Sequence, residues 1–397
     1  MSSIFPGATV GILGGGQLGR MVTLAARTLG YHVHVLDPDP HCAAGPVADK
    51  VVTAKFDDAE ATARLAAECD VVTIEIERIA VPALEAAARQ APLRPGAHVL
   101  HTVQDRARQK EWLVANGFPV GPFRTAATRE VFADAARRVM ADAAGRPTSA
   151  YAKSCTGGYD GRGQVRLERA ADADAAWVAL GSGPCVIEQA LDLEAEISVL
   201  VARRPNGTMI VYPPALNHHV RGVLDWSVIP APISPIVAQR ASEVGLRIAE
   251  RLNVVGLLVV ELFLLRDGSL TVNELAPRPH NTFHHTELTV LTSQFEQLVR
   301  AVCDLPLGAT DVVRPAAIAN LFGDLWLGDT PPAWEEALSI PGVRIHLYGK
   351  APRPGRKVGH IGAVGLTTDE AVARVKEARS RLERSRTPTA QPPAVSG

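Results

Sequence analysis

The stretch VELFLLRDGSLTVNELAPRPHN, residues 260–281, consists of two apolar runs joined by Asp267-Gly268. An Asp-Gly pair between apolar runs is the strongest short-range signal for a β-hairpin. With these two residues as the loop, Glu261 and Glu274 lie directly opposite each other on the paired strands. The Cβ atoms of such a pair are about 4.5–5.5 Å apart.

Two carboxylates that face each other destabilise a sheet, so the pair needs a divalent cation or a shared proton. Mg²⁺ prefers a site with one or two carboxylates whose coordination is completed by phosphates. The hairpin therefore predicts a magnesium site at Glu261 and Glu274. The alternatives are a β-bulge that shifts the register, or a glutamate that is merely solvated.

The rest of the chain divides into regions of different pattern. Its first hundred residues alternate short apolar strands with helices, which predicts a parallel sheet in a Rossmann-like domain. The middle of the chain lacks this alternation, which indicates antiparallel sheets. We expect an α/β and α+β multidomain protein: a Rossmann-like domain at 1–102, a central domain at 103–310 with a small lid-bearing part at 103–185 and a large part at 186–310, a small β-rich C-terminal domain at 311–385, and a disordered tail at 386–397.

Composition excludes several classes of protein. Of the 397 residues, 47% are apolar and the net charge is −1, so the chain lacks the basic surface of a nucleic-acid-binding protein. Five scattered cysteines in no metal-binding spacing indicate a reduced, cytoplasmic protein. We expect no membrane segment, because no window approaches the roughly 18 apolar residues of a membrane span.

A glycine-rich turn, GGGQLG at residues 14–19, follows a strand and opens a helix, and Asp37 ends the next strand. This G-x-G-x-x-G spacing is typical of dinucleotide-binding folds and leaves open an NAD(P)-dependent oxidoreductase. The rival interpretation is a different anionic ligand at the same turn, because helix N-terminal amides favour any anion.

A second glycine-rich segment, residues 153–164, has four glycines in twelve residues and begins with Lys153. Such a loop can close over phosphates with its backbone N–H groups while the lysine adds a charge. A flexible hairpin tip is the alternative. Glu188-Gln189, after an apolar strand, is either an adenine-reading linker or an ordinary strand end.

Four cations surround the sequence PRPGR near the C-terminus: Lys350, Arg353, Arg356 and Lys357. A solvated turn is one interpretation. The other is a monoester phosphate site, since proline and glycine would hold the cations in a fixed shape.

Taken together, the ordered segments GGGQLGRM, TIEIER, QDRARQK, KSCTGGYDGRGQ, VIEQ, AEISV, VVELF, NELAPRPHN, SQFEQ and RPGRKVGH resemble the ATP-grasp superfamily. Within it they resemble the N5-carboxyaminoimidazole ribonucleotide synthetases of purine biosynthesis, over roughly residues 8–365. The resemblance implies three domains, an ATP-grasp fold with ATP between two antiparallel sheets, and a homodimer.

The resemblance also implies roles for individual residues. The ATP contacts would be Arg106, Lys110, Lys153, Gly157, Gly158, Glu188, Gln189, Glu196 and Asn273. The magnesium ligands, with Mn²⁺ as a possible substitute, would be Glu261 and Glu274. Contacts to aminoimidazole ribonucleotide would be Gln17, Leu18, Glu75, Tyr159, Asp160, Arg162, Lys350, Arg356 and Lys357. The catalytic residues, which serve bicarbonate and its carboxyphosphate, would be Arg278, His280, Asn281, Lys153 and His219.

The implied reaction is attack of bicarbonate on the γ-phosphate of ATP, followed by capture of the carboxyl group by the amine of the ribonucleotide. Four positions depart from the family pattern: Cys155, Phe283, His285 and Leu298. Because Phe283 stands where the family has glycine, we expect a reshaped loop there. The departures leave an alternative open, namely a paralogous ATP-grasp ligase that joins a different carboxylic acid to a different amine.

Overall fold

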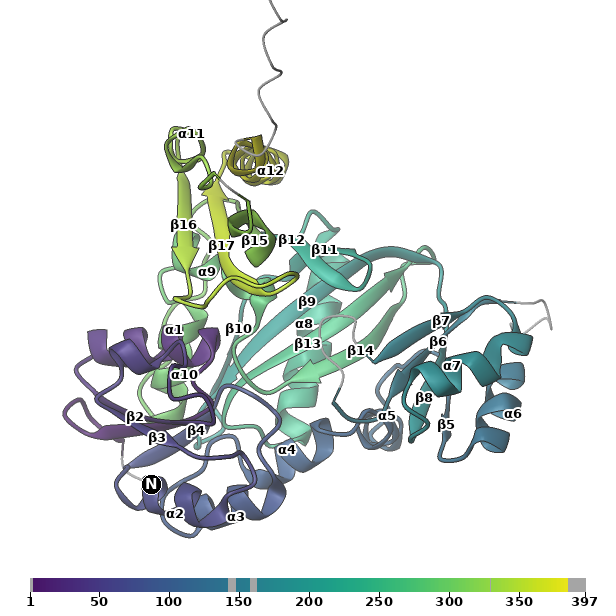
Figure 1. Ribbon diagram of the computed structural model, residues 1–397, viewed down its shortest axis with the longest axis horizontal. Helices are drawn as coiled ribbons and strands as arrows, with labels where there is room; N and C mark the ends of the chain where they lie inside the picture. The colour runs from purple at the N-terminus through teal and green to yellow at the C-terminus, as the bar shows by residue number, and fades with distance from the viewer. Residues whose placement is uncertain (1–2, 142–147, 158–162, 329, 385–397) are drawn as a thin grey trace, which may run out of the picture.

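The computed structural model describes residues 3–141, 148–157, 163–328 and 330–384, and these residues form three sheets (Figure 1). The N-terminal sheet lies at the lower left of Figure 1, and the sheet of strands β5 to β8 lies at the right. The C-terminal strands β15 to β17 lie at the top. The large sheet runs between them. Among the helices of the described residues, none has the length and apolar character needed to cross a membrane.

The N-terminal sheet is parallel, in the order β3-β2-β1-β4, which confirms the predicted βαβ opening. Strands β1 and β4 are almost completely buried, as expected for a parallel sheet covered on both faces. The elements are β1 (Thr9–Leu13), α1 (Gln17–Thr28), β2 (His32–Asp37), η1 (Gly45–Val47), β3 (Lys50–Thr53), α2 (Ala59–Ala67), β4 (Val71–Ile74), α3 (Val81–Ala88) and α4 (Ala97–Val103).

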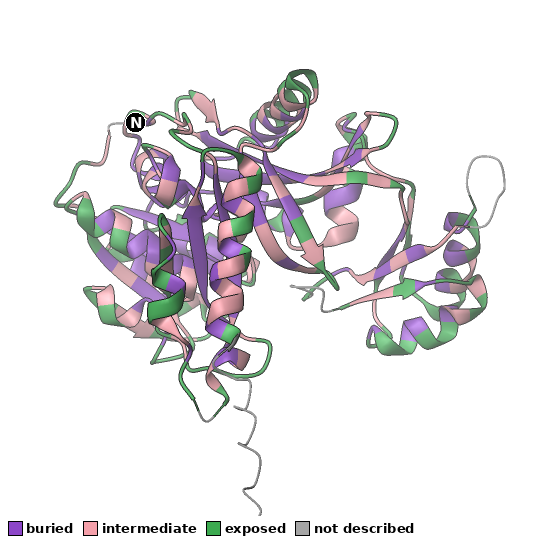
Figure 2. Ribbon diagram, turned by 90° about the horizontal axis from the view of Figure 1, so that it is seen from above, coloured by how far each residue is buried: buried purple, intermediate pink, exposed green. Residues whose placement is uncertain are grey.

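A small antiparallel sheet, in the order β5-β8-β6-β7, projects from the body of the molecule in both ribbon views (Figures 1 and 2). Its own core includes Phe132 and Trp177, whose rings meet edge to face at 5.5 Å. The elements are α5 (Arg106–Ala115), β5 (Phe123–Ala126), α6 (Arg129–Val139), β6 (Ala150–Ser154), β7 (Gln164–Leu167), η2 (Ala170–Asp172), α7 (Ala173–Ala179) and β8 (Cys185–Gln189).

The large sheet has the order β14-β13-β9-β11-β12-β15-β17-β16, with β10 paired to β9. Strands β9 and β13 are buried along most of their length (Figure 2). Val199 and Val201 pack in one cluster with α8, and Leu200 and Ala202 pack in another with α10, as the alternation of a strand requires. The elements are β9 (Leu193–Arg203), β10 (Met209–Val211), β11 (Ala215–Val220), β12 (Val223–Ile229), α8 (Pro235–Arg251), β13 (Gly256–Leu265), β14 (Leu270–Ala276), η3 (Asn281–Phe283), α9 (Thr286–Thr289) and α10 (Gln294–Val302).

The C-terminal strands continue this same sheet, because β15 pairs with β12 through partners such as Ala319 and Trp226. The strands of the predicted β-rich C-terminal region are present, but they share a sheet with the central region. Helix α12 covers them and buries Val375 and Leu382. The elements are β15 (Ala316–Phe322), η4 (Gly323–Trp326), α11 (Trp334–Leu338), β16 (Val343–Leu347), β17 (Lys357–Val364) and α12 (Thr368–Arg384).

The β13–β14 hairpin exists, but its loop differs from the predicted two-residue loop. The Leu265 amide donates to the carbonyl of Ser269 at 2.9 Å, so the loop has three residues. Gly268 has φ +79°, the left-handed conformation that closes three-residue hairpin loops. Sequence reasoning chose the wrong loop length because an Asp-Gly pair fits both turn types.

A bulge farther along the hairpin restores the predicted pairing of the two carboxylates. Leu262 pairs with Val272, whereas Glu261 pairs with Glu274, so Asn273 is the extra residue. The longer loop and the bulge offset each other by one residue. The glutamates therefore lie opposite each other as expected, for a reason that the simple register argument did not contain.

Candidate active site

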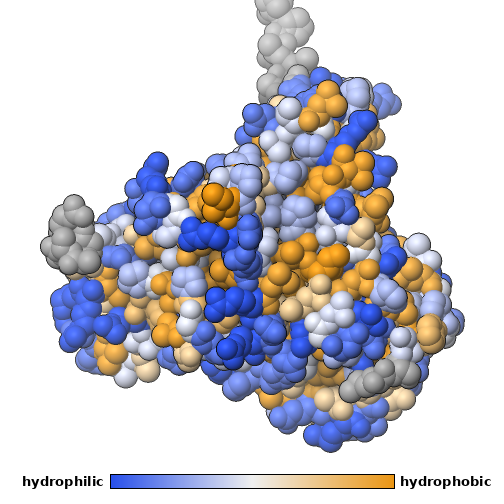
Figure 3. Space-filling view, turned by 180° about the vertical axis from the view of Figure 1, so that it is seen from behind, coloured by the Kyte–Doolittle hydropathy of each residue, from blue (hydrophilic) through white to orange (hydrophobic). Residues whose placement is uncertain are grey.

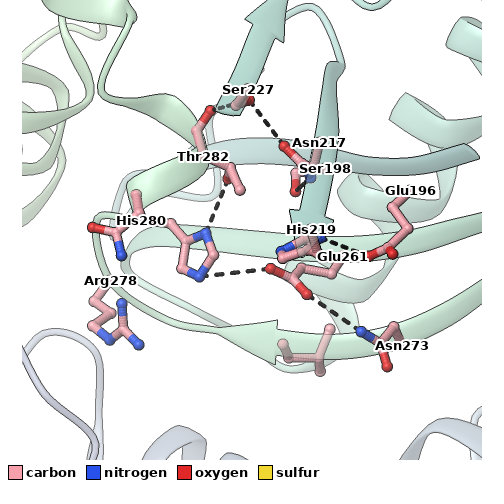
Figure 4. A network of polar contacts seen from close by, with 12 residues as sticks. Glu196, Ser198, Asn217, His219, Ser227, Glu261, Asn273, Arg278, His280 and Thr282 are labelled. Carbon is pink, nitrogen blue, oxygen red and sulfur yellow. Dashed lines mark hydrogen bonds and ion pairs between the residues drawn. The ribbon is translucent and has the colours of Figure 1, made fainter. Parts of the chain in front are cut away.

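The site is built around Glu261, on β13, which Figure 4 shows between side chains from three other strands or loops. The amide of Asn273 donates to its Oε2 at 3.3 Å, and the Nε2 atom of His280 lies 3.7 Å from its Oε1. Burial and the charge of Glu274 raise the pKa of Glu261 to about 7. A carboxylate held beside a second carboxylate is stabilised when it binds a cation or a proton.

His219 reaches the same place from β11, where a bulge between His218 and His219 interrupts the pairing with β12. Its Nδ1 atom lies 2.8 Å from Oε2 of Glu196. Burial lowers the pKa of His219, but the hydrogen bond and charge of Glu196 outweigh burial and raise it. His219 is thus the more basic of the two imidazoles beside Glu261.

Two lysines flank Glu188 at the junction of the small and large sheets. Lys110 from α5 lies 3.0 Å from one carboxylate oxygen and Lys153 from β6 lies 3.2 Å from the other. Burial raises the pKa of Glu188, but the two lysines lower it further than burial raises it. Lys153 also donates to Asn273 at 3.4 Å, which connects this cation pair to the hairpin.

Helix α5 begins at a side-chain cap, because Asp105 accepts a hydrogen bond from the Arg108 amide at 3.0 Å. Arg106 follows this cap and donates to the Ser154 carbonyl at 2.8 Å. The predicted ATP contact Arg106 thereby ties α5 to the end of β6, next to Lys153.

The turn at residues 14–19 already holds a carboxylate of this chain. Glu75 accepts hydrogen bonds from the amides of Gly16 and Gly19, at 2.9 and 3.0 Å. A Cβ atom on Gly14 would lie 2.4 Å from the Glu75 side chain, so the glycines are needed for its close approach. The pyrophosphate of a dinucleotide would need these amides. The Gly-rich spacing therefore does not support the oxidoreductase alternative.

Arg278, in the loop after β14, is fixed by an ion pair that sequence reasoning missed. Its Nε atom lies 2.7 Å from Oε1 of Glu77. Burial lowers the pKa of Arg278, but Glu77 and the nearby Glu75 raise it overall. The guanidinium keeps its charge although the side chain is only 20% exposed, which suits an anion-holding role. Glu77 stands two residues after Glu75 in the segment TIEIER, which was its only sequence signal.

His280 follows in the same loop, and Gln294 of α10 holds its backbone. The His280 amide donates to Gln294 Oε1 at 2.9 Å, and Gln294 Nε2 donates to the His280 carbonyl at 3.0 Å. Burial, and then the charge of Arg278, lower the pKa of His280 well below its usual value. The imidazole is therefore neutral. Sequence reasoning also missed Gln294, which looks like an ordinary helix residue.

A buried network of polar side chains lies next to this loop (Figure 4). The hydroxyl of Thr282 lies 2.9 Å from Nδ1 of His280. The carbonyl oxygen of Thr282 lies 3.0 Å from the hydroxyl of Ser227. Asn217 lies 2.9 Å from that hydroxyl and donates to Ser198 at 2.6 Å. The network links the His280 loop to β9, β11 and β12, and none of its members was expected from sequence.

The C-terminal cations meet the N-terminal turn. Lys350 contacts the side-chain oxygen of Gln17, the first residue of α1. Lys357 is almost completely buried, and Arg356 donates to the Ala351 carbonyl at 3.1 Å. Residues from opposite ends of the chain, which were both predicted to contact the ribonucleotide, thus lie together.

The remaining predicted residues have mixed positions. Leu18 is only 5% exposed and packs in the core, so only its backbone can meet a ligand. The Gln189 side chain donates to Ala141 and Thr148, away from Glu188. Asn281 contacts Nε2 of His284 at 3.0 Å, and Gly157 accepts from Arg78 at 3.3 Å. The predictions for Gly158, Tyr159, Asp160 and Arg162 lie outside the described residues.

The four departures from the family pattern are buried. Phe283, His285 and Leu298 have no exposed surface, and Cys155 is 5% exposed. Phe283 packs edge to face against Tyr212 at 6.3 Å and needs no left-handed backbone. These residues shape the core under the site rather than its lining, so they do not support a different substrate.

Models of known families match three consecutive parts of the chain. They are the ribonucleotide synthetase preATP-grasp domain at residues 7–104, the ATP-grasp domain at 111–295, and the phosphoribosylaminoimidazole carboxylase C-terminal domain at 316–374. The chain is 38% identical to the N5-carboxyaminoimidazole ribonucleotide synthase of Bacillus subtilis, over 94% of this chain and 95% of that protein.

Solved structures agree with these matches. An ADP complex of an N5-carboxyaminoimidazole ribonucleotide synthetase has a TM-score of 0.88 and 37% identity, over 96% of this chain and 100% of that one. The Aspergillus clavatus synthase in complex with ADP and 5-aminoimidazole ribonucleotide has a TM-score of 0.85 and 33% identity, over 95% of this chain and 99% of that one.

Proposed function

We propose that this chain, which belongs to the N5-carboxyaminoimidazole ribonucleotide synthase family of ATP-grasp ligases, carboxylates 5-aminoimidazole ribonucleotide with bicarbonate and ATP. The products are N5-carboxyaminoimidazole ribonucleotide, ADP and phosphate. The observation that carries the proposal is the position of the Glu261–Glu274 pair, because it has a lysine pair on one side and Arg278 with His280 on the other. Phosphoryl transfer and carboxyl transfer could thus share one site.

The nucleotide half of the site would be formed by Lys110, Lys153 and Glu188, where the small sheet meets the large one. Phosphoryl transfer depends mainly on positioning and on neutralising charge. Lys153 can exchange its contact with Glu188 for phosphate oxygens while Lys110 keeps the carboxylate paired. Arg106, Gln189, Glu196 and Asn273 remain proposed ATP contacts.

Glu261 and Glu274 fit a bound Mg²⁺, since they are opposed carboxylates, and burial together with the charge of Glu274 raises the pKa of Glu261. When bound, the ion would supply charge neutralisation to the triphosphate. Asn273 and His280, which contact Glu261, would orient its two oxygens.

The carboxyl half would use the loop after β14. A bicarbonate oxygen attacks the γ-phosphorus of ATP, the bond to the β-phosphate oxygen breaks, and carboxyphosphate and ADP result. Arg278, whose charge Glu77 maintains, would hold this anion. The exocyclic amine then attacks the carboxyl carbon and displaces phosphate, or phosphate leaves first and the amine attacks the CO₂ that is released. The departing phosphate can take the amine proton; neutral His280 can position a substrate by hydrogen bonding, and His219, with its raised pKa, can stabilise negative charge.

The ribonucleotide would lie between the N-terminal turn and the C-terminal cations. Gln17 and Lys350 are already in contact there, and Arg356 and Lys357 follow on the same segment. Cations of this kind suit a monoester phosphate. Glu75 would hold the glycine turn that forms the other wall. Tyr159, Asp160 and Arg162 would complete this site.

The test is ADP formation with ATP and Mg²⁺, with bicarbonate and aminoimidazole ribonucleotide added separately and together. We expect full turnover only with both. Arg278→Met should lower kcat, and Arg266→Met is the matched control because that arginine lies exposed at the hairpin tip. ADP release that ignores the ribonucleotide, or a better response to other carboxylic acids than to bicarbonate, would refute the proposal.

A homodimer would follow from the family resemblance. Apolar residues gather near the centre of the rear face of the molecule, which supports such a contact (Figure 3). Sedimentation of the purified chain would give the mass of a dimer; a monomer at micromolar concentration would contradict it.

A further inference from the structure

A second group of metal-binding side chains lies outside the proposed reaction site. It joins Glu287 of α9, His346 of β16 and His360 of β17, whose candidate ligand atoms all lie within 4.8 Å of one another. We propose that these three residues bind one divalent transition-metal ion, such as Zn²⁺, separately from the Glu261–Glu274 pair. Two imidazoles and a carboxylate are a donor set that suits Zn²⁺ and its neighbours rather than Mg²⁺.

Strand pairing brings the two imidazoles together. His346 and His360 are direct partners in the β16–β17 ladder, so their side chains share one face of the sheet. Their ring centroids are 5.1 Å apart. Glu287 approaches the same face, and its Oε2 lies 3.7 Å from Nδ1 of His346. Ligands at about 2.1 Å from a tetrahedral zinc ion are roughly 3.4 Å apart, so a small inward movement would complete the site.

A second contact orients one ligand. Nδ1 of His360 lies 2.9 Å from the hydroxyl of buried Tyr348, which leaves Nε2 as the nitrogen available to a metal. Metal-binding histidines usually have such a partner on the other ring nitrogen, because it fixes the ring and its tautomer. His360 is buried, whereas the side chains of His346 and Glu287 are 29% and 31% exposed. Solvent can therefore reach the site, and a water molecule could be the fourth ligand.

Packing alone explains only part of this arrangement. His284, His360 and His346 form a column of stacked rings, with centroid distances of 4.6 and 5.1 Å. Stacking does not explain the carboxylate of Glu287 beside the column. A hydrogen-bonded ion pair does not explain it either, because Oε2 of Glu287 and Nδ1 of His346 are 3.7 Å apart, too far for a hydrogen bond. Two cations also lie nearby, Arg344 close to Glu287 and Arg20 close to His346.

The site would connect three elements around the C-terminal cations. His346 and His360 stand on either side of residues 348–356, which contain Lys350 and Arg356. A bound ion would therefore link both ends of this loop, through His346 and His360, to Glu287 of α9. Zinc should raise the thermal stability of the chelator-treated protein even in excess Mg²⁺.

The experiment uses the full chain, treated with a chelator and then dialysed against Zn²⁺ or Co²⁺ in excess Mg²⁺. Zinc per chain is measured by mass spectrometry, and the cobalt ligand-field spectrum reports the ligands. Glu287→Gln and His346→Asn remove one ligand each from partly exposed positions, so both should stay folded. His32→Asn is the matched control. Nδ1 of His32 also lies near a carboxylate, 3.8 Å from Asp49, but that pair contains one imidazole where the proposed site has two.

We expect one zinc ion per chain in the wild type, in His32→Asn and in Glu261→Gln. Glu287→Gln and His346→Asn should bind at least about 10-fold more weakly, since even indirect partners of a metal ligand contribute 10–100-fold. The proposal is overturned if the wild type binds no zinc, or if both variants keep its affinity and spectrum. Loss of zinc in Glu261→Gln alone would overturn it too, because the ion would then belong to the hairpin.

Discussion

Glu75 and Glu261 are two carboxylates of the candidate active site with opposite surroundings, the first buried and the second 18% exposed. Glu75 accepts hydrogen bonds from two backbone amides at the start of α1, so this chain satisfies both of its oxygens. Glu261 faces Glu274 across a hairpin, its side-chain contacts are the Asn273 amide and neutral His280, and the more basic His219 lies nearby. Hydrogen bonds within the protein stabilise the Glu75 carboxylate without a ligand, whereas the charge of Glu274 destabilises the Glu261 carboxylate.

The difference separates a supporting role from a binding role. Burial raises the pKa of Glu75, but the amides of Gly19 and Gly16 oppose that rise. At Glu261 the second cause, Glu274, acts in the same direction as burial. Binding of a cation or a proton relieves the repulsion within such a pair. We therefore expect changes at the hairpin to affect catalysis and changes at the turn to affect shape.

The largest effect should follow loss of either hairpin carboxylate. Glu261→Gln and Glu274→Gln each remove a proposed magnesium ligand, and metal stabilisation of transferring charge contributes several kcal/mol. The expected loss in kcat is on the order of 10³-fold. Steady-state ADP formation measures it. Asp267→Asn, at the exposed tip of the same hairpin, is the control and should stay near the wild-type rate. Near-normal rates in both glutamine variants would contradict the metal assignment.

Glu75→Gln should have a smaller effect that is specific to one substrate. A glutamine offers one oxygen to two amides, so the Gly16 or Gly19 N–H loses its partner at a cost of about 1–3 kcal/mol. We expect the KM for the ribonucleotide to rise roughly 10-fold while the KM for ATP stays constant. Initial rates with each substrate varied in turn separate the two. An equal rise in both KM values would mean that the turn also shapes the ATP site.

The same contrast explains how much the sequence could predict. The opposed glutamates were accessible because strand pairing converts sequence spacing into distance. The G-x-G-x-x-G turn was ambiguous, since nothing local to residues 14–19 reveals that Glu75, from another strand, occupies its amides. Glu77 was missed because its partner, Arg278, is far away along the chain, and Gln294 because a helix pattern does not show that this side chain faces the His280 loop. Long-range partners of this kind appear only when the fold is known.

The strand order had a similar limit. Alternation of apolar residues indicated the strands of the C-terminal region, but it could not show that β15 joins β12. The loop length of the hairpin was also wrong, and the bulge at Asn273 was not foreseen. A bulge depends on which strands are neighbours and on which face of the sheet is buried. The local sequence pattern of one hairpin shows neither.

Magnesium binding should depend on pH. The pKa of Glu261 is raised to about 7 in the metal-free protein, so the folded state binds more protons than the unfolded state between the usual carboxyl range and pH 7. Metal-free stability should therefore fall as pH rises through this window. Mg²⁺ competes with that proton, and its stabilising effect should be larger at pH 8 than at pH 6.

Thermal unfolding with and without Mg²⁺ measures this dependence, and we expect the shift in Tm to grow by about 2 °C or more. Glu274→Gln is the control, since it removes the opposing charge and one proposed ligand together. In that variant the Mg²⁺ shift should be small at both pH values. A wild-type shift that is equal at pH 6 and pH 8 would argue against a shared proton at the pair.

The smallest effect should come from Asp37, the acidic residue that made the turn resemble a dinucleotide site. Its Oδ2 accepts a hydrogen bond from the Gly15 amide at 2.7 Å, and its Oδ1 accepts one from the Asp39 amide at 2.8 Å. Asp37→Asn keeps one acceptor and loses the charge, at a cost of about 1 kcal/mol. We expect a slightly lower Tm and unchanged kcat and KM for ATP. If Asp37 instead read a nucleotide ribose, the KM for ATP would rise with little change in Tm, and the turn would no longer count as a purely supporting element.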